Sequence, residues 1–373
     1  MTSFVQGETL TFVGSGATGV FLDTDSTGPG TGSYITYGIT AGDPAASDVV
    51  TGTSTATCIL SSGTADFVGV VWQGQCQNQE FSGAGTQLTI SGSTASSTAY
   101  KECKTVAGAS FRDHANIQTN QLRYNAANGC GIRGTSASTA TLVEQEDQCR
   151  ISKLQISSTG SDSRAVAGSV GSTDITYVDD VIIEGTGTGT GTTAGAASFP
   201  AANIIRNSVI IQRASAAGQI IGTGTGSPSF YNCTLAAADD LATAPTRVLL
   251  SGASGTVTVQ NCGLFAGDST KAIKAGSATF NFTTCYSDIS GTAGVTQTTY
   301  SSEFENVNDA TRDFRLKTGA AQIDTGTTDA TNAAIDIAGT ARPSGAAYDV
   351  GAWEFVQAGQ SVNVGWESTG QWL

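Results

Sequence analysis

A short phrase that recurs through residues 150–287 constrains the fold of this chain more than any other feature. In each copy, residues typical of β-strands surround one polar residue, and these polar residues are Ser152, Asp179, Asn207, Asn232, Asn261 and Thr284. The successive gaps between them are 27, 28, 25, 29 and 23 residues. An irregular period in the twenties around a fixed turn residue is typical of a solenoid, in which each repeat packs on its neighbours.

Roughly two dozen residues supply about three short strands and three turns, which is one coil of a parallel β-helix, and coils stack at about 4.8 Å. Equivalent side chains then lie directly above one another, and an Asn at a turn can bond both its own backbone and the Asn one coil away. We therefore expect the six polar residues to form a ladder. The following residue points to the other side of the wall, so we expect Cys233, Cys262 and Cys285 to form an interior stack.

A β-sandwich with regularly spaced strands is the alternative to a solenoid. Its strands have no physical reason to repeat the same turn residue six times, because they do not stack in register along one axis. The repeat therefore favours the parallel β-helix.

The Asn-Cys phrases and the coil length resemble the right-handed parallel β-helix superfamily, which includes pectate-lyase-like enzymes and phage tailspikes. A later region is similar to the segment that closes many bacterial β-helix proteins, although Ala320-Ala321 stands where those proteins usually carry Ser-Pro. The matching stretches are residues 313–316, 323–326, 336–339, 342–343 and 349–354. The resemblance implies an all-β chain folded as a single-stranded right-handed parallel β-helix with N-terminal and C-terminal capping segments. It is specific for the fold and weak for activity.

The repeat divides the chain into four parts. Residues 1–60 lie outside it and are expected to form a β-rich cap or docking segment, because an uncapped coil exposes a sheet edge. Residues 61–300 form the β-helix, residues 301–355 a C-terminal cap and residues 356–373 a tail. The tail carries Trp366 and Trp372, which are candidate partner contacts or part of a strap packed on the chain itself.

Composition excludes several classes of function. The net charge of −14 and the pI near 4.3 disfavour binding to nucleic acid and to anionic membranes. No basic and apolar leader opens the chain, and no run of 18 apolar residues predicts a membrane span. The eight cysteines include no CxxC pair, and the chain contains a single His, so no zinc site is expected. Reduced, buried thiols are the expected state, with a disulfide between stacked cysteines as the alternative. No metal or other cofactor is predicted.

Three groups of residues were weighed as catalytic machinery. Asp179-Asp180 is a carboxylate pair, but adjacent strand residues point to opposite faces, so it can share a substrate only from a turn. Arg112-Asp113-His114 resembles acid–base machinery without a nucleophile at motif spacing. The third group contains carboxylates that can meet across coils as glycosidases require: Glu144, Glu146, Asp147, Asp179 and Glu184. None of these residues is predicted to be catalytic.

The resemblance to phage structural modules, together with the missing catalytic motifs, predicts a structural surface protein of a bacteriophage virion. A capsid decoration protein is favoured over a tail spike or fibre, because the chain is short and has no coiled-coil heptads. The expected partners are the major capsid protein or tail proteins and two further copies in a homotrimer, with host surface glycans as additional ligands. The alternatives are a polysaccharide lyase or hydrolase and a bacterial surface adhesin.

Overall fold

The computed structural model divides the chain into two compact units, residues 1–70 and residues 71–373. The structure describes residues 9–24, 35–41, 49–52, 57–59, 72–90, 100–113, 121–137, 139–145, 148–160, 164–168, 176–186, 195–214, 218–224, 226–239, 241–251 and 255–356. The tail with Trp366 and Trp372, as well as His114, Glu146 and Asp147, lies outside these residues.

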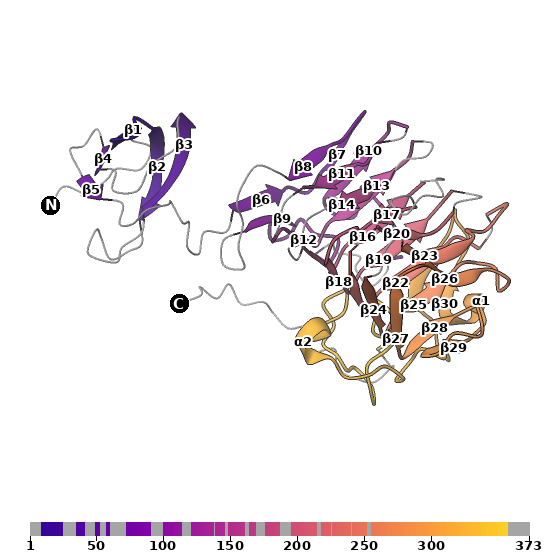
Figure 1. The fold of residues 1–373 in the computed structure, drawn as a ribbon. Coiled ribbons are helices and arrows are strands. Elements are labelled where there is room, and N and C mark those ends of the chain that lie inside the picture. The colour runs from indigo at the N-terminus through magenta and orange to yellow at the C-terminus, as the bar shows by residue number, and fades with distance from the viewer. Residues whose placement is uncertain are drawn as a thin grey trace. The chain divides into compact units, whose positions relative to one another are not determined.

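The first unit is an antiparallel sheet in the strand order β3-β2-β1-β4-β5 (Figure 1). Alternation along β1 places Leu10 and Phe12 in the interior, where Val50 of β4 is also buried. The strands are β1 (Thr9–Val13), β2 (Thr18–Thr24), β3 (Ile35–Ala41), β4 (Val49–Gly52) and β5 (Thr57–Ile59).

The second unit is a parallel β-solenoid whose coils each contribute one strand to each of three walls. The first wall contains β6 (Trp72–Cys76), β9 (Lys101–Thr105), β12 (Arg150–Ser152), β15 (Tyr177–Asp179), β18 (Ile204–Arg206), β21 (Ser229–Tyr231), β24 (Thr256–Gln260) and β27 (Thr279–Thr283). The second wall contains β7 (Glu80–Gly83), β10 (Gly131–Gly134), β13 (Gln155–Ser158), β16 (Ile182–Gly185), β19 (Val209–Gln212), β22 (Thr234–Ala237), β25 (Gly263–Phe265), β28 (Cys285–Ser287) and β29 (Val295–Gln297). The third wall contains β8 (Leu88–Ile90), β11 (Leu142–Glu144), β14 (Val166–Gly168), β17 (Ala197–Ser198), β20 (Ile221–Gly224), β23 (Arg247–Ser251) and β26 (Ala272–Gly276). The predicted all-β parallel solenoid is confirmed.

Register-matched apolar side chains fill the interior of the solenoid. In the second wall, the β-sheet pairing stacks one inward residue per coil, in the order Ile132, Ile156, Ile183, Ile210, Leu235 and Leu264. These residues are at most 3% exposed and belong to one continuous core. Stacking in register lets every coil bury its apolar face on the next one, which a single coil cannot do alone.

The C-terminal strap, residues 300–356, packs on the outer face of the second wall. It contains α1 (Tyr300–Glu303), β30 (Phe304–Asn306), β31 (Asp313–Leu316) and α2 (Ala330–Ala333). A second apolar cluster joins Ile211 and Phe265 of the wall to Phe304, Phe314 and Val350 of the strap. The ring of Phe265 is stacked on that of Tyr300 with centroids 4.7 Å apart. The segment predicted as a C-terminal cap therefore runs back along the body, beside β25 and β28 (Figure 1).

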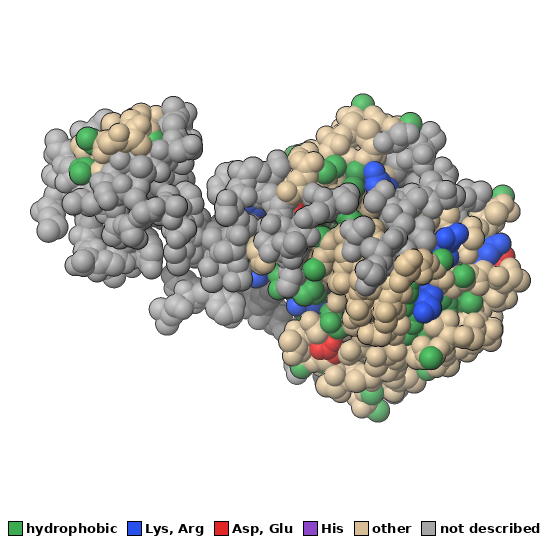
Figure 2. Space-filling model, viewed as in Figure 1, with side chains coloured by type: hydrophobic (Ala, Val, Ile, Leu, Met, Phe, Trp, Pro, Cys, Tyr) green, Lys and Arg blue, Asp and Glu red, His purple; other side chains and the backbone are tan. Residues whose placement is uncertain are grey.

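Uncharged side chains dominate the visible surface of the described residues, with scattered Lys and Arg and a few acidic side chains (Figure 2). This matches the low charged fraction of 13%. No helix among the described residues is long and apolar enough to cross a membrane.

Candidate functional site

The turn between the first and second walls contains a column of residues in the left-handed backbone conformation. These residues are Lys153, Asp180, Asn207, Asn232, Asn261 and Thr284, with φ between 45° and 59°. The predicted ladder is therefore corrected by one residue in its first two coils. Ser152 pairs with Asp179 and Asp179 with Arg206, so Ser152 and Asp179 are the last strand residues before the turn. Asn and Asp tolerate this conformation better than other non-glycine residues, which is why they recur in the column.

Asn232 and Asn261 stack one coil apart, and the Asn261 amide nitrogen donates to the Asn232 side-chain oxygen at 3.4 Å. The stronger bonds of Asn261 go to the strap. Its amide nitrogen donates to the Thr327 carbonyl at 2.7 Å, and its side-chain oxygen accepts from the Thr327 amide at 2.8 Å. Thr284 contacts the Thr327 hydroxyl at 2.8 Å. The last residues of the column therefore hold the strap against the solenoid.

The residue after each turn residue points inward, as alternation requires. Cys233, Cys262 and Cys285 are each fully buried in the solenoid core and are free thiols. The Cys233 backbone amide donates to the Cys262 sulfur at 3.4 Å, so these two residues are in contact between coils. Burial raises the pKa of the Cys285 thiol to about 12. A neutral thiol is the form that an apolar interior favours.

The Asp179 and Asp180 side chains lie in different environments. Asp179 forms a two-pronged ion pair with Arg206, with distances of 2.6 and 2.7 Å. Asp180 is buried and lies 2.8 Å from the Arg112 guanidinium, which also donates to the Asp336 and Ile337 carbonyls of the strap. The two carboxylates thus serve two different arginines, and Arg112 has a role in holding the strap.

Glu184 is a buried polar anchor on the outer face of the second wall. One carboxylate oxygen accepts from the Tyr124 amide at 2.6 Å, and the other accepts from Arg312 of the strap. Only 1% of the surface of Glu184 is exposed. Glu144 is also buried, at 2% exposed, but lies in the third wall. The structure therefore does not bring Glu144 and Glu184 into one wall.

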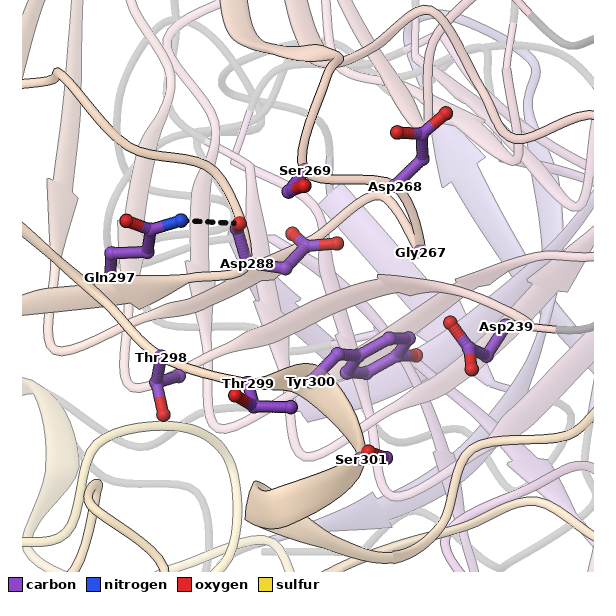
Figure 3. Close-up of a pocket in the computed structure, with 10 residues that line it drawn as sticks. All are labelled: Asp239, Gly267, Asp268, Ser269, Asp288, Gln297, Thr298, Thr299, Tyr300 and Ser301. Carbon is purple, nitrogen blue, oxygen red and sulfur yellow. Dashed lines mark hydrogen bonds between the residues drawn. The ribbon is translucent and has the colours of Figure 1, made fainter.

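A cavity of about 380 Å³ opens where the strap leaves the last coils (Figure 3). It is lined by residues from four separate stretches of chain: Asp239, Gly267, Asp268, Ser269, Asp288, Gln297, Thr298, Thr299, Tyr300 and Ser301. Three carboxylates and several hydroxyl groups therefore line the same cavity. This is the candidate functional site of the second unit.

Asp288 is the buried carboxylate of this cavity, with 6% of its surface exposed. Its Oδ1 accepts from the Ala266 amide at 3.2 Å and from the Ser287 hydroxyl at 3.4 Å, whereas its Oδ2 is buried without a hydrogen-bond partner. Burial raises the pKa of the Asp288 carboxyl above its usual range. In Figure 3 the carboxylate extends into the space framed by Gly267, Ser269 and Tyr300. Hydrogen bonds from the Ala266 and Gly267 backbone and from the Ser287 side chain offset part of the rise in the Asp288 pKa.

The other lining groups differ from Asp288 in being satisfied or exposed. Asp268 accepts from Thr270 and lies 3.3 Å from the Lys271 ammonium. Tyr300 is buried, and its hydroxyl donates to the Ala237 carbonyl at 2.5 Å. Burial raises the pKa of Tyr300, and the charges of Asp288 and Asp239 raise it further. Asp288 is thus the buried one of the three lining carboxylates.

Sequence reasoning did not find this cavity. It did not single out Asp288 or Tyr300. One signal was present: Asp239 and Asp268 are separated by 29 residues, the same spacing as Asn232 and Asn261. Residues at one coil spacing on the same turn lie side by side in a solenoid. Among the described residues, no group of three His, Cys, Asp or Glu side chains is arranged to hold a metal ion.

The fold and the site define this chain as a parallel β-solenoid whose second wall is covered by its own C-terminal segment. No protein-family model, curated protein or solved structure matches the chain at a significant level.

Proposed function

We propose that this protein is a structural surface component of a bacteriophage virion, most simply a capsid decoration protein. The observation that carries the proposal is the division of the chain into a small antiparallel unit, residues 1–70, and a long solenoid unit, residues 71–373. A decoration protein needs an attachment module and a stable projecting body, and the two units supply separate folds for these tasks. The N-terminal unit is the proposed docking module.

The packing of the solenoid supports a role that demands durability. The strap is itself stabilised by a buried ion pair between Arg342 and Glu354, whose charged groups lie 3.0 Å apart. Arg112, Glu184 and Asn261 add further anchors spread over several coils. Covering a sheet face and its hydrogen-bonding groups limits local opening, which is the step that exposes a chain to proteases.

The partners follow from this proposal. The N-terminal unit contacts the major capsid protein or a tail protein, and the protein assembles as a homotrimer, which is the state that the resemblance to phage β-helix modules implies. A trimer has three times the 37.7 kDa mass of the chain. Sedimentation at micromolar concentration measures this mass, and a monomer at all concentrations would contradict the trimer.

Proteomics of purified particles tests the proposal itself. The expected result is that the chain co-purifies with particles through a density gradient in a fixed ratio to the major capsid protein. Particles made without its gene serve as the control. Recovery of the chain only in the soluble lysate, with none in the particle band, would overturn the proposal.

A polysaccharide lyase or hydrolase is the second candidate, and the cavity around Asp288 is the observation that favours it. Enzymes that cleave glycans use carboxylates in a surface hollow, at least one of which has a raised pKa. The test is release of reducing ends or unsaturated products from bacterial polysaccharides. Activity that is lost in Asp288→Asn and retained in Asp179→Ala would favour this enzyme.

A further inference from the structure

Two strands of the first wall bring a pair of cysteine thiols together at the N-terminal end of the solenoid interior. Cys76 is the last residue of β6, and Cys103 is the middle residue of β9. Their Sγ atoms lie 3.9 Å apart, although the two residues are 27 positions apart in sequence. A movement of about 2 Å would bring the two sulfurs to the length of a disulfide bond, about 2.05 Å.

Cys76 is the member of this pair that a dissolved reagent can reach. It is partly exposed, whereas Cys103 is 5% exposed and the stacked Cys233 and Cys262 are fully buried. An oxidant can therefore react with Cys76 in the folded protein, but it can reach the interior stack only after the core opens. Cys103 lies on the inner side of Cys76, where a bulky oxidant is excluded.

The contacts of Cys76 favour its reactive form. Hydrogen bonds with the Cys103 and Cys130 thiols lower the pKa of the Cys76 thiol, and partial burial offsets only some of this effect. The thiolate is the form that attacks a disulfide, so a lowered pKa keeps more of the nucleophile present at neutral pH. The hydrogen bond with Cys76, together with burial, raises the pKa of Cys103. Cys76 is thus the nucleophile and Cys103 the neighbouring thiol that can displace a group bound to it.

The strand that carries Cys76 can supply the small movement that a disulfide requires. Among the described strands, β6 pairs with β9 alone and forms the edge of the first wall. The register pairs Cys103 with Gly74, so Cys76 and Cys103 are diagonal neighbours on the inner face. A bond between them would draw the end of β6 along β9. An edge strand opens and shifts at a lower cost than a strand paired on both sides.

We propose that Cys76 and Cys103 form a redox-active pair that a small disulfide, such as oxidised glutathione, converts to an intramolecular disulfide. The Cys76 thiolate attacks one sulfur of the oxidant, which forms a mixed disulfide and releases one glutathione thiolate. The Cys103 sulfur then attacks the Cys76 sulfur, and its proton passes to the second departing glutathione. Two protein thiols are oxidised, and one oxidant disulfide is reduced to two thiols. Excess reduced glutathione reverses the exchange.

The bond would fasten the first strand of the wall to the second. It closes a loop of 27 residues, and a disulfide that closes such a loop stabilises the fold mainly by restricting the unfolded chain. The pair stays reduced against a reducing glutathione pool and is oxidised outside it. This inference does not depend on the proposed place of the protein in a virion, because both cysteines lie within the solenoid unit.

The test is incubation of the folded full-length protein with oxidised glutathione, followed by alkylation of the remaining thiols and peptide mapping by mass spectrometry. We expect one cross-linked pair of peptides, which contains Cys76 and Cys103. The melting temperature rises by about 3–6 °C, and dithiothreitol reverses the rise. In Cys103→Ser the reaction stops at the mixed disulfide, with one glutathione bound to Cys76. In Cys76→Ser neither product forms.

Cys130→Ser is the matched control, because it removes the other thiol in contact with Cys76 and should leave the cross-link in place. Thermal unfolding of the reduced variants shows whether each is folded, and mapping of the parent protein tests the pair without any substitution. Three results would overturn the proposal: Cys76 and Cys103 both remain free in the folded parent after prolonged oxidation, Cys76 is cross-linked to a different cysteine, or the bond forms only after denaturation.

Discussion

The Asn261 side chain and the Thr327 backbone form a two-way hydrogen-bonded pair, with distances of 2.7 and 2.8 Å, across 66 residues of sequence. One amide side chain thereby satisfies both backbone groups of a strap residue and also reaches the asparagine of the previous coil. The polar column that organises the turns of the solenoid is thus also the attachment point of the strap.

Replacing Asn261 should loosen the strap. In Asn261→Ala the Thr327 amide and carbonyl lose their partner, and alanine must adopt a φ of 51°, so we expect a loss of about 2–4 kcal/mol in unfolding free energy. Asn261→Gly removes the same bonds without the backbone strain and should lose about 1 kcal/mol less. Denaturant unfolding measures both values. Asn308→Ala, at an exposed strap position, is the control, and equal stabilities of Asn261→Ala and this control would contradict the assignment.

Arg342 should be among the most sensitive strap residues. Its guanidinium lies 3.0 Å from Glu354 and donates to the Asp349 and Gly351 carbonyls at 2.9 and 2.8 Å, all within the interior. Arg342→Ala leaves a buried carboxylate without its partner, which costs about 3–5 kcal/mol. The partly exposed pair of Lys104 and Glu102 is the comparison, and Lys104→Ala should change stability by less than about 1 kcal/mol. Comparable losses in the two variants would show that the Arg342 pair is not buried in solution.

Stability should fall as pH rises from 5 to 8. Burial raises the pKa of Asp180 and Asp349 from 3.8 to about 6, and that of Glu354 from 4.5 to about 7. The folded chain then holds protons more tightly than the unfolded chain, so this contribution is complete below about pH 4 and is lost as pH rises through 6 to 7. Melting temperatures across this range provide the measurement.

Asp180→Asn separates this effect from the general charge of the chain. Asparagine suits the turn position, as Asn207 and Asn232 show, and Arg112 keeps its bonds to Asp336 and Ile337. The variant should lose a share of the pH dependence on the order of 2 kcal/mol, since one pKa unit corresponds to about 1.4 kcal/mol. The same slope of stability against pH in the variant and the parent would contradict the buried state of Asp180.

The interior cysteines should be inert in the native protein. Cys233, Cys262 and Cys285 are fully buried, whereas Cys76 is partly exposed. A thiol reagent should therefore label Cys76 before these three residues, which react only after unfolding. Peptide mapping after timed labelling identifies the sites. Early labelling of Cys262 would show that the core opens or that the stack faces solvent.

The repeat period and the turn residues predicted the solenoid, because asparagine at a left-handed turn can be recognised directly in the sequence. This turn signal was strong at Asn207, Asn232 and Asn261 and led to the correct turn position there. It was weak earlier, where Lys153 carries no turn signal and Asp180 stands beside another aspartate, so the ladder was placed one residue too early.

The cavity could not be predicted in the same way. It joins turns of different coils to the start of the strap, and the path of the strap depends on contacts between residues far apart in sequence, such as Phe265 with Tyr300 and Glu184 with Arg312. Asp288 has no motif around it. Its burial beside the start of the strap is a property that only the folded structure shows.

Electron cryomicroscopy of phage particles made with and without this gene tests the central functional claim most directly. The account predicts a density on the particle surface that fits the three-walled solenoid, with the antiparallel unit of residues 1–70 at its point of attachment, and that disappears when the gene is deleted. Identical particles with and without the gene would contradict a virion role.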